Sequence, residues 1–262
     1  MKQVTLTVIE NKQLTPTTWR MKLAGDTSAI TTPGQFINLR LDGHFLRRPI
    51  SVNDVDEGSV TIIYKVLGHG TEEMTHYEPG RQLDVLTGLG NGYDLADAGD
   101  RPLLIGGGVG IPPLYLAAKR LKEDGREVTV ILGFNTADET YYVDEFTALG
   151  CEVVTATADG SVGVKGTVVD AFREIAGNSE STDASDDSSA PFSHFYTCGP
   201  EPMLKAVYRA VYEDAGISGQ MSFEERMGCG FGACMGCSCK TVTGYKRICK
   251  DGPVLRTEEI LW

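Results

Sequence analysis

Four cysteines near the end of the chain constrain its fold and its function more than any other feature. They follow the spacing C-x4-C-x2-C-x11-C. This spacing is typical of the four thiolates that hold a [2Fe–2S] cluster. The predicted metal ligands are therefore Cys229, Cys234, Cys237 and Cys249.

Glycines surround the first three of these cysteines. One short loop can present three thiolates to two irons only if it is tight, and a tight loop needs positive φ angles and close backbone approach. Backbone N–H groups in such a loop can also hydrogen-bond the sulfurs and help to set the reduction potential. The glycines that allow this conformation are Gly228, Gly230, Gly232 and Gly236.

A zinc site and a set of disulfides are the two alternatives for these thiols. Zinc sites usually contain paired C-x2-C units, and here Cys234 and Cys237 form the only such pair. None of the seven cysteines precedes Cys151, a distribution that suits a metal site in a reducing compartment. Cys239 lies one residue beyond Cys237, where a strand-like step turns its side chain away. We interpret it as a bystander that could substitute for a lost ligand.

The length and the net charge of the chain limit its possible domain organisation and partners. A chain of 262 residues is long enough for two compact domains and a small appendage. A net charge of −12 argues against a nucleic-acid partner. No apolar run approaches the roughly 20 residues that span a bilayer. Residues 1–9 alternate like a strand and lack the apolar block of a signal peptide, so we expect the cytoplasm.

The first 98 or so residues predict a small antiparallel β-barrel. Apolar and polar residues alternate in most of its short segments, and Pro33-Gly34 and Pro79-Gly80 mark turns. Such a series of short strands is typical of a closed all-β domain. The predicted strands cover residues 4–9, 18–23, 35–41, 59–66 and 82–86.

Two segments of this barrel favour a nucleotide cofactor. In residues 47–51 two arginines precede Pro-Ile-Ser, and a planar guanidinium suits a pyrophosphate while the serine could reach a flavin ring atom. In residues 63–71 a strand leads into a glycine-rich turn and an expected helix start at Thr71, where backbone donors favour phosphate. Either segment alone could be an ordinary solvated turn. Together in one barrel they are stronger evidence.

From about residue 99 the pattern changes to alternating strands and helices. A short buried strand at 101–105 leads through the glycine turn 106–110 into a helix that runs to about Asp124, and 127–132 is the next strand. Glycines at such a turn let the backbone approach a pyrophosphate at the helix N-terminus. The G-x-G-x-x-G fingerprint is not matched, and a purely structural turn could look similar. The predicted nucleotide contacts are Gly107, Gly108 and Gly110.

The residues after the second strand of this domain indicate which nucleotide binds. Asn135, Asp138 and Glu139 follow the second strand with no basic residue close by. Acidic groups there suit a ribose hydroxyl and repel a 2′-phosphate, which favours NAD over NADP. Further strands are expected at 152–157 and 194–197 and a helix at 202–215, with residues 178–190 as a disordered surface loop.

These segments together predict an α+β multidomain protein. Residues 1–98 form an antiparallel β-barrel that binds FAD, residues 99–216 an α/β doubly wound domain that binds NAD, and residues 217–262 a small C-terminal [2Fe–2S] domain. Nicotinamide exchanges two electrons as a hydride and a [2Fe–2S] cluster carries one, so a flavin must stand between them. No motif of the chain indicates a separate site for an organic substrate with acid and base groups. We therefore expect an oxidoreductase subunit that exchanges electrons with a partner protein.

The flavin segments resemble the FAD-binding signature of the ferredoxin reductase-like superfamily. There an R-x-[YFI]-S segment holds the isoalloxazine and a later Gly-Thr the pyrophosphate. Residues 196–200 resemble the C-G-P segment of the same reductases, which places Cys198 beside the nicotinamide ring. On residue type alone, Cys198 could also be a small buried hydrophobe. The resemblance implies FAD contacts from Arg48, Pro49, Ile50, Ser51, Ile63, Tyr64, Lys65, Gly70 and Thr71.

The whole set, in this order and at this length, resembles the electron-transfer subunit of class 1B dihydroorotate dehydrogenase. The resemblance covers residues 47–51, 106–114, 198–200 and 227–254. It implies a partner subunit with FMN that oxidises dihydroorotate, electron flow through the cluster and FAD to NAD⁺ in pyrimidine biosynthesis, and a heterotetramer of two catalytic and two electron-transfer subunits. The 178–190 segment and Cys239 depart from the family pattern.

Two other functions fit the same motifs. A reductase subunit of another complex, such as an NADH-dependent ferredoxin:NADP oxidoreductase or a sulfhydrogenase gamma subunit, shares the barrel, the nucleotide domain and the C-terminal cluster. From a different class, a redox sensor could bind nucleotide and change partner with the state of its cluster. Such a sensor would not reduce a dye with NADH.

Overall fold

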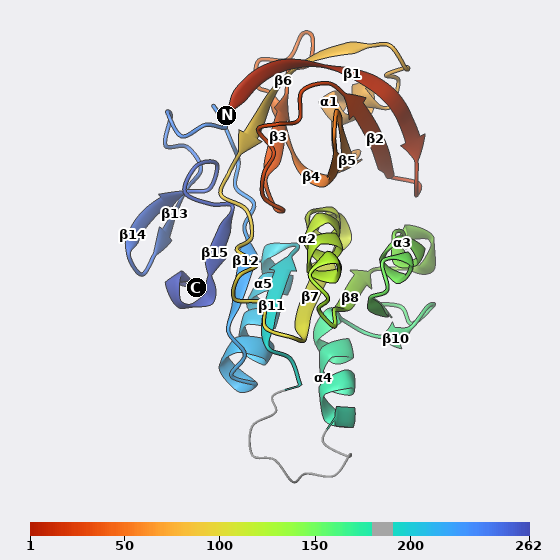
Figure 1. Ribbon diagram of the computed structural model, residues 1–262, viewed down its shortest axis with the longest axis vertical. Coiled ribbons are helices and arrows are strands. Elements are labelled where there is room, and N and C mark those ends of the chain that lie inside the picture. The colour runs from red at the N-terminus through yellow and green to blue at the C-terminus, as the bar shows by residue number, and fades with distance from the viewer. Residues whose placement is uncertain (180–190) are drawn as a thin grey trace. The chain divides into compact units, whose positions relative to one another are not determined.

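The computed structural model describes residues 1–179 and 191–262. Contacts between residues divide the chain into two compact units (Figure 1). One unit contains Met1–Tyr93, Ser222–Leu255 and Glu259–Leu261, and the other contains Asp94–Met221, Arg256–Glu258 and Trp262. The cysteine-bearing segment thus belongs to the same compact unit as the N-terminal strands. The finer division into domains 1–98, 99–216 and 217–262 stays a prediction.

The N-terminal strands close into an antiparallel barrel in the order β1-β2-β5-β4-β3-β6. In β6 every second side chain is buried, because successive side chains of a strand point to opposite faces. The predicted barrel is confirmed. Its elements are β1 (Lys2–Gln13), β2 (Thr18–Ala24), β3 (Phe36–Leu39), β4 (Arg48–Asp56), β5 (Ser59–Lys65), α1 (His69–Met74) and β6 (Gln82–Leu89).

A short hairpin and the chain around it complete this unit. β13 (Ser238–Thr241) pairs with β14 (Gly244–Arg247) in antiparallel register. Asn91, which follows the last barrel strand, hydrogen-bonds to the backbone of Val254, beyond the last cysteine in the sequence. Its Nδ2 donates to the Val254 carbonyl at 2.7 Å, and the Val254 N–H donates to its Oδ1 at 3.1 Å. One amide side chain therefore fixes the cysteine-bearing segment to the end of the barrel.

The second unit is built on a parallel sheet. The sheet order is β10-β9-β8-β7-β11-β12-β15, and the neighbours from β10 to β11 run parallel. Every residue of β7 is buried, as expected for a strand covered on both faces. The strands are β7 (Pro102–Gly107), β8 (Thr129–Phe134), β9 (Glu152–Thr157), β10 (Val164–Lys165), β11 (His194–Cys198) and β12 (Gly219–Ser222). The last strand, β15 (Val254–Arg256), has its first two residues in the first unit and Arg256 in the second.

The helices of this unit follow the strands in the alternation that the sequence predicts. The helix after the glycine turn and the one after the C-G-P segment are both present, and the second continues as a π-helix, Tyr208–Asp214. The α-helices are α2 (Pro112–Glu123), α3 (Val143–Ala148), α4 (Val168–Ser179) and α5 (Glu201–Val207).

Two further findings complete the fold. Residues 180–190 lie outside the described residues, and with them most of the segment 178–190 for which disorder is predicted. None of the helices that the structure describes is both long and apolar enough to cross a membrane.

Candidate functional site

The four predicted ligand cysteines form two neighbouring pairs. The Cys234 N–H points to Cys229 Sγ at 3.5 Å, and the Cys249 N–H points to Cys237 Sγ at 3.4 Å. A [2Fe–2S] cluster has two irons and takes four thiolates, so two pairs of thiols agree with its ligand count. In the described residues, no three His, Cys, Asp or Glu side chains are grouped as the ligands of a single ion. The ligand set stays a prediction.

Backbone donors converge on the first sulfur. The Ala233 N–H donates to Cys229 Sγ at 3.3 Å, in addition to the Cys234 N–H. Burial raises the pKa of Cys229, but these N–H groups and that of Phe231 outweigh it and lower the pKa from 9.0 to about 6. The thiolate, which is the form that binds metal, is therefore favoured at neutral pH.

The second pair is buried. Cys237 and Cys249 are each only 2% exposed. Burial, together with the neighbouring Cys237 thiol, raises the pKa of Cys249 to about 12. A bound metal ion deprotonates a coordinating thiol outright, so Cys249 needs the ion to become charged. None of the seven cysteines, which all lie in the described part of the chain, forms a disulfide, and Cys239 lies half-buried in β13.

The cysteine loop is held by residues that sequence reasoning did not assign. Gly230 has φ +77°, and a Cβ there would lie 2.3 Å from Asn38 Nδ2. Asn38 is 1% exposed in β3, and its Nδ2 points to the Cys229 carbonyl at 3.5 Å. The only signal for Asn38 in the sequence was an amide within the otherwise apolar strand Phe36–Leu39.

Arg247 holds the loop from the other side. Its Nε and Nη2 donate to the two Asp251 carboxylate oxygens at 2.8 and 3.0 Å, and its Nη1 donates to the Gly232 carbonyl at 2.9 Å. A planar guanidinium can make these bonds together because its donors are fixed in one plane. No motif in the sequence pointed to Arg247.

Two predicted flavin residues from distant parts of the sequence meet in the structure. A Cβ on Gly70, in α1, would lie 2.7 Å from Arg48 Nε and Nη2. The guanidinium of Arg48 therefore lies directly against the glycine backbone, a contact that any side chain at this position would disturb. Arg48, Pro49, Ile50 and Ser51 are all partly exposed along the first half of β4.

The neighbouring Arg47 binds to the strand β6. Arg47 Nη2 donates to both carboxylate oxygens of Asp84 at 3.0 Å, and Nη1 donates to the Asp84 carbonyl at 2.9 Å. Because this guanidinium is engaged by β6, it is not available to a pyrophosphate, and the predicted FAD contacts do not include Arg47. Arg48 alone remains for that contact.

The other expected flavin residues differ in their availability. Tyr64 is 1% exposed and its hydroxyl donates to Asn11 Oδ1 at 3.1 Å, so its ring belongs to the barrel core, as does Ile63. Lys65 is partly exposed. The Thr71 hydroxyl accepts the Leu67 N–H at 2.9 Å and donates to the Gly68 carbonyl at 3.0 Å, so it closes its own turn. The helix α1 begins at His69, two residues earlier than expected, and has six residues.

In the second unit, the glycine turn and the C-G-P segment lie against each other. β11 runs parallel to β7, with Cys198 opposite Gly106. A Cβ on Gly110 would lie 2.1 Å from the Cys198 carbonyl oxygen, and one on Gly107 would lie 2.4 Å from Met203 Sδ. Ligands of open α/β sheets bind at the carboxyl ends of the strands, where the strand order reverses. Cys198 is half-buried at this edge.

Tyr141 is a residue of this edge that sequence reasoning missed. Its hydroxyl donates to the Gly108 carbonyl at 2.8 Å, and burial raises its pKa. The turn at Gly108, which has φ +51°, is thus fixed by a neutral phenol. Two adjacent tyrosines after a polar turn were no specific signal in the sequence.

The acidic residues that favour NAD follow β8. Asn135 Nδ2 donates to Glu139 Oε2 at 2.7 Å. The short 3₁₀-helix Ala137–Glu139 carries Asp138, whose carboxylate accepts the Thr136 hydroxyl. These bonds hold a carboxylate pair at the end of the second strand, as the sequence predicts.

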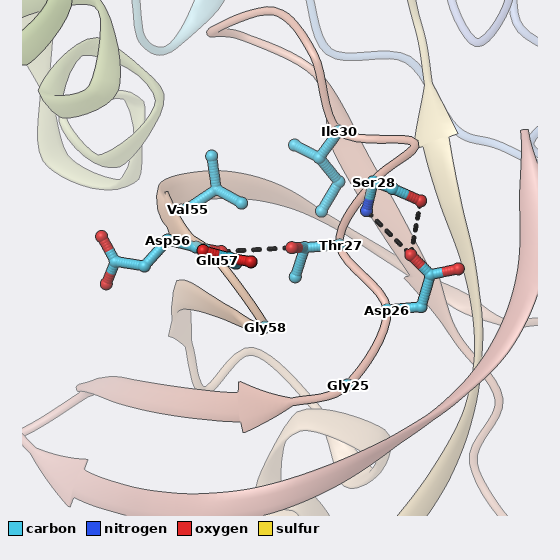
Figure 2. A pocket seen from close by; sticks show the side chains of 9 residues that line it. All are labelled: Gly25, Asp26, Thr27, Ser28, Ile30, Val55, Asp56, Glu57 and Gly58. Carbon is cyan, nitrogen blue, oxygen red and sulfur yellow. Dashed lines mark hydrogen bonds between the residues drawn. The ribbon is translucent and has the colours of Figure 1, made fainter.

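A separate hollow on the barrel contains none of the predicted residues. Its wall carries the acidic side chains of Asp26, Asp56 and Glu57 (Figure 2). Asp26 accepts the Ser28 N–H at 2.9 Å. Lys2 Nζ also pairs with Asp26 at 2.9 Å. These contacts hold the Asp26 carboxylate within its own turn. The lining residues are Gly25, Asp26, Thr27, Ser28, Ile30, Val55, Asp56, Glu57 and Gly58.

Two family models match the chain. Residues 224–261 match the iron-sulfur cluster binding domain of dihydroorotate dehydrogenase B, and residues 104–209 match the oxidoreductase NAD-binding domain. Both matches cover segments whose cofactors were predicted from local motifs. They confirm the iron–sulfur and NAD predictions.

Similar proteins cover nearly the whole chain. The dihydroorotate dehydrogenase B (NAD(+)) electron transfer subunit of Fusobacterium nucleatum is 43% identical over 270 residues, covering 99% of each chain. The subunit of the same name from Geobacillus sp. is 39% identical and covers 100% of this chain and 99% of its own. Among solved structures, an NADH-dependent reduced ferredoxin-NADP oxidoreductase described in connection with flavin-based electron bifurcation aligns with TM-score 0.84 and 31% identity. It covers 98% of this chain and 90% of that one.

These comparisons agree with the fold and with the predicted set of FAD, a [2Fe–2S] cluster and NAD. They favour the dihydroorotate dehydrogenase assignment over the reductase of another complex, because full-length relatives of that name reach 43% identity and the oxidoreductase structure 31%. The chain is an oxidoreductase subunit, and it belongs to the family of electron transfer subunits of dihydroorotate dehydrogenase B (NAD(+)).

Proposed function

We propose that this chain transfers electrons to NAD⁺ in pyrimidine biosynthesis. It receives them from a catalytic subunit that oxidises dihydroorotate. The observation that carries the proposal is the pairing of the four thiols in the same compact unit as the barrel, with backbone N–H groups directed at their sulfurs. When bound, the cofactors supply one-electron transfer at the [2Fe–2S] cluster, hydride transfer at the nicotinamide and a link between the two at FAD.

The residues of the chain bind and orient these groups. Cys229 and Cys234 form one pair of ligands to the cluster, and Cys237 and Cys249 form the other. Gly230 lets the loop pass close to Asn38, so the backbone donors keep their direction toward sulfur. Hydrogen bonds to the sulfurs raise the potential of such clusters by stabilising the extra negative charge.

Flavin and nucleotide are bound by different segments. Arg48 binds the anionic part of FAD, with Pro49, Ile50, Ser51, Ile63, Tyr64, Lys65, Gly70 and Thr71 as the further predicted contacts. The buried Tyr64 and Ile63 can contribute only their backbone. In the second unit Gly107, Gly108 and Gly110 admit the pyrophosphate of NAD, and Cys198 lies beside the nicotinamide. Asp138 and Glu139 repel the 2′-phosphate of NADP.

The chain acts as one subunit of a larger enzyme. Its partner is a catalytic subunit that contains FMN, and the assembly is a heterotetramer of two catalytic and two electron-transfer subunits. The place is the cytoplasm, where thiols stay reduced and can bind iron. The support for this assembly is the family to which the chain belongs and the lack of acid and base groups for an organic substrate in the sequence.

The test is to express the chain together with its genomic neighbour and to measure orotate formation coupled to NAD⁺ reduction. We expect a complex that contains FMN, FAD, iron and sulfide, and a coupled rate with NAD⁺ that exceeds the rate with NADP⁺. A partner with nickel or several [4Fe–4S] clusters would support the other reductases instead. Reduction of a dye by NADH in the isolated chain would rule out the redox sensor.

A further inference from the structure

Three side chains from separate elements form a chain of contacts that ends on Arg48. His44 lies in the loop between β3 and β4, and its Nδ1 is 3.0 Å from Arg48 Nη2. Its Nε2 is 3.2 Å from Glu73 Oε2, in α1. The imidazole therefore connects a carboxylate to the predicted flavin-binding guanidinium.

The chemistry of the partners fixes which nitrogen carries the proton. A guanidinium can only donate hydrogen bonds, so Nδ1 of His44 must accept from Arg48 and is unprotonated. The proton of the neutral imidazole is then on Nε2, which donates to the Glu73 carboxylate. Glu73 thus selects the tautomer that offers a lone pair to Arg48.

Glu73 is itself held in place. The Tyr77 hydroxyl donates to Glu73 Oε1 at 2.8 Å, and Arg81 Nη2 lies 3.8 Å from the same oxygen. Arg81 also stacks on the Tyr77 ring at 3.9 Å from its centroid. The carboxylate that orients His44 therefore has a defined position of its own.

Arg48 is restrained from two further directions. Its Nη1 donates to the Leu46 carbonyl at 2.6 Å, and its guanidinium lies against the backbone of Gly70, where a Cβ would be only 2.7 Å away. The hydrogen bonds to Leu46 and His44 and the contact with Gly70 fix the plane of the guanidinium before a ligand binds. Such fixing reduces the conformational entropy that binding must otherwise remove.

We propose that His44, held by Glu73, is a positioning residue that fixes the Arg48 guanidinium for the pyrophosphate of FAD. The inference rests on the proposed function, which assigns Arg48 to FAD. It adds two residues, neither of which belongs to the flavin signature in the sequence. Their role is to hold an acceptor at one place beside Arg48, and no contact of their own with the cofactor is required.

The decisive property is the acceptor at the position of Nδ1, and two substitutions separate it from the rest of the ring. His44→Asn places an amide oxygen near the position of Nδ1 and loses the contact with Glu73. His44→Gln places an amide N–H near the position of Nε2 and loses the acceptor toward Arg48. The two variants are alike in polarity and differ in which half of the network they retain.

FAD affinity of the deflavinated full-length chain, followed by quenching of flavin fluorescence, measures the effect. We expect His44→Gln and His44→Ala to weaken FAD binding about tenfold, and His44→Asn to stay within about threefold of the unsubstituted chain. Glu73→Ala should weaken binding by less than His44→Gln, because the imidazole remains. The melting temperature and the visible absorption of the cluster should be unchanged, which separates positioning from a loss of fold.

Arg48→Ala distinguishes the failure of this inference from the failure of the FAD assignment. If Arg48→Ala leaves FAD affinity unchanged, the placement of the flavin is wrong. If Arg48→Ala weakens binding but His44→Gln does not, or if His44→Asn is as weak as His44→Gln, His44 does not position Arg48. In the Arg48→Ala background, His44→Gln should have no further effect, because the two residues act through one contact.

Discussion

At the scale of single residues, Gly230 and Gly236 provide a matched test of the cysteine loop. Gly230 has φ +77° and faces Asn38 Nδ2, 2.3 Å from the place of a Cβ, whereas a Cβ on Gly236 would lie 3.5 Å from Cys234 Sγ, an ordinary contact. Gly230→Ala should cost about 1 to 3 kcal/mol in loop stability through its left-handed backbone and the clash. We expect iron and sulfide content to fall in this variant and to remain in Gly236→Ala.

The measurement is iron and acid-labile sulfide per chain, with FAD content as the control for the barrel. Equal cluster content in the two glycine variants would mean that the backbone around Cys229 is freer than the contact with Asn38 implies. Loss of FAD from Gly230→Ala would mean that the change had spread into the barrel.

At the scale of elements, periodicity predicted most of the fold, and its failures have local causes. Five barrel strands and the alternation after residue 99 followed from hydrophobic patterns. β4 was not among the predicted strands, because Pro49 and four charged residues from Arg47 to Asp56 obscure its alternation. The barrel tolerates this proline because β4 pairs only with β3 there, Asn38 opposite Pro49, and its pairing with β5 begins at Val52, so Pro49 lies at an edge.

Arg47 shows what such patterns cannot predict. Its partner Asp84 is 37 residues away in the sequence and becomes a neighbour only when β6 joins the barrel. The flavin signature singles out Arg48, but nothing in the local sequence shows that Arg47 binds a carboxylate of another strand. The role of Arg47 is therefore a property of the closed barrel.

This difference leads to a prediction for Arg47→Gln. Loss of the two-oxygen contact with Asp84 should destabilise the chain by about 1 kcal/mol, or about 3 °C in melting temperature, because the pair is only partly buried. FAD affinity should hardly change. Arg40→Gln is the matched control, since Arg40 reaches the same carboxylate at 3.7 Å from an exposed position.

The pH dependence of this effect has a defined sign. Burial raises the pKa of Asp84, but hydrogen bonds from Arg47 and Gln3 lower it by more, so the pKa of this carboxyl in the folded state lies below its ordinary value. The stabilisation is present above that value and is lost as the pH falls through the lower pKa of the folded state. The difference between Arg47→Gln and the unsubstituted chain should therefore shrink in acid. A difference that grows in acid would contradict the ion pair.

At the scale of the whole molecule, the sequence predicted the cofactors better than the residues that position them. The cysteine spacing and the glycine turn are local in sequence, so each could be recognised without a fold. Asn38, His44 and Tyr141 act on segments far from them in the sequence, respectively the Cys229 loop, Glu73 and Gly108. Such residues become visible only in three dimensions, because their partners are chosen by the packing of strands and helices.

Different segments of the chain bind the cluster and FAD. Loss of the cluster should therefore interrupt electron transfer without releasing FAD. Cys234→Ser should remove the visible absorption of the cluster and lower orotate-coupled NAD⁺ reduction at least about 100-fold, since even the neighbours of metal ligands can cost 10 to 100-fold. FAD should remain bound and NADH should still reduce a dye, because residues 48–71 and 107–110 contain none of the cysteines. Cys239→Ser, in the same loop region, should change none of these properties. If Cys234→Ser also releases FAD, the cluster and flavin sites depend on each other, and if Cys239→Ser bleaches the cluster, the ligand assignment must be revised.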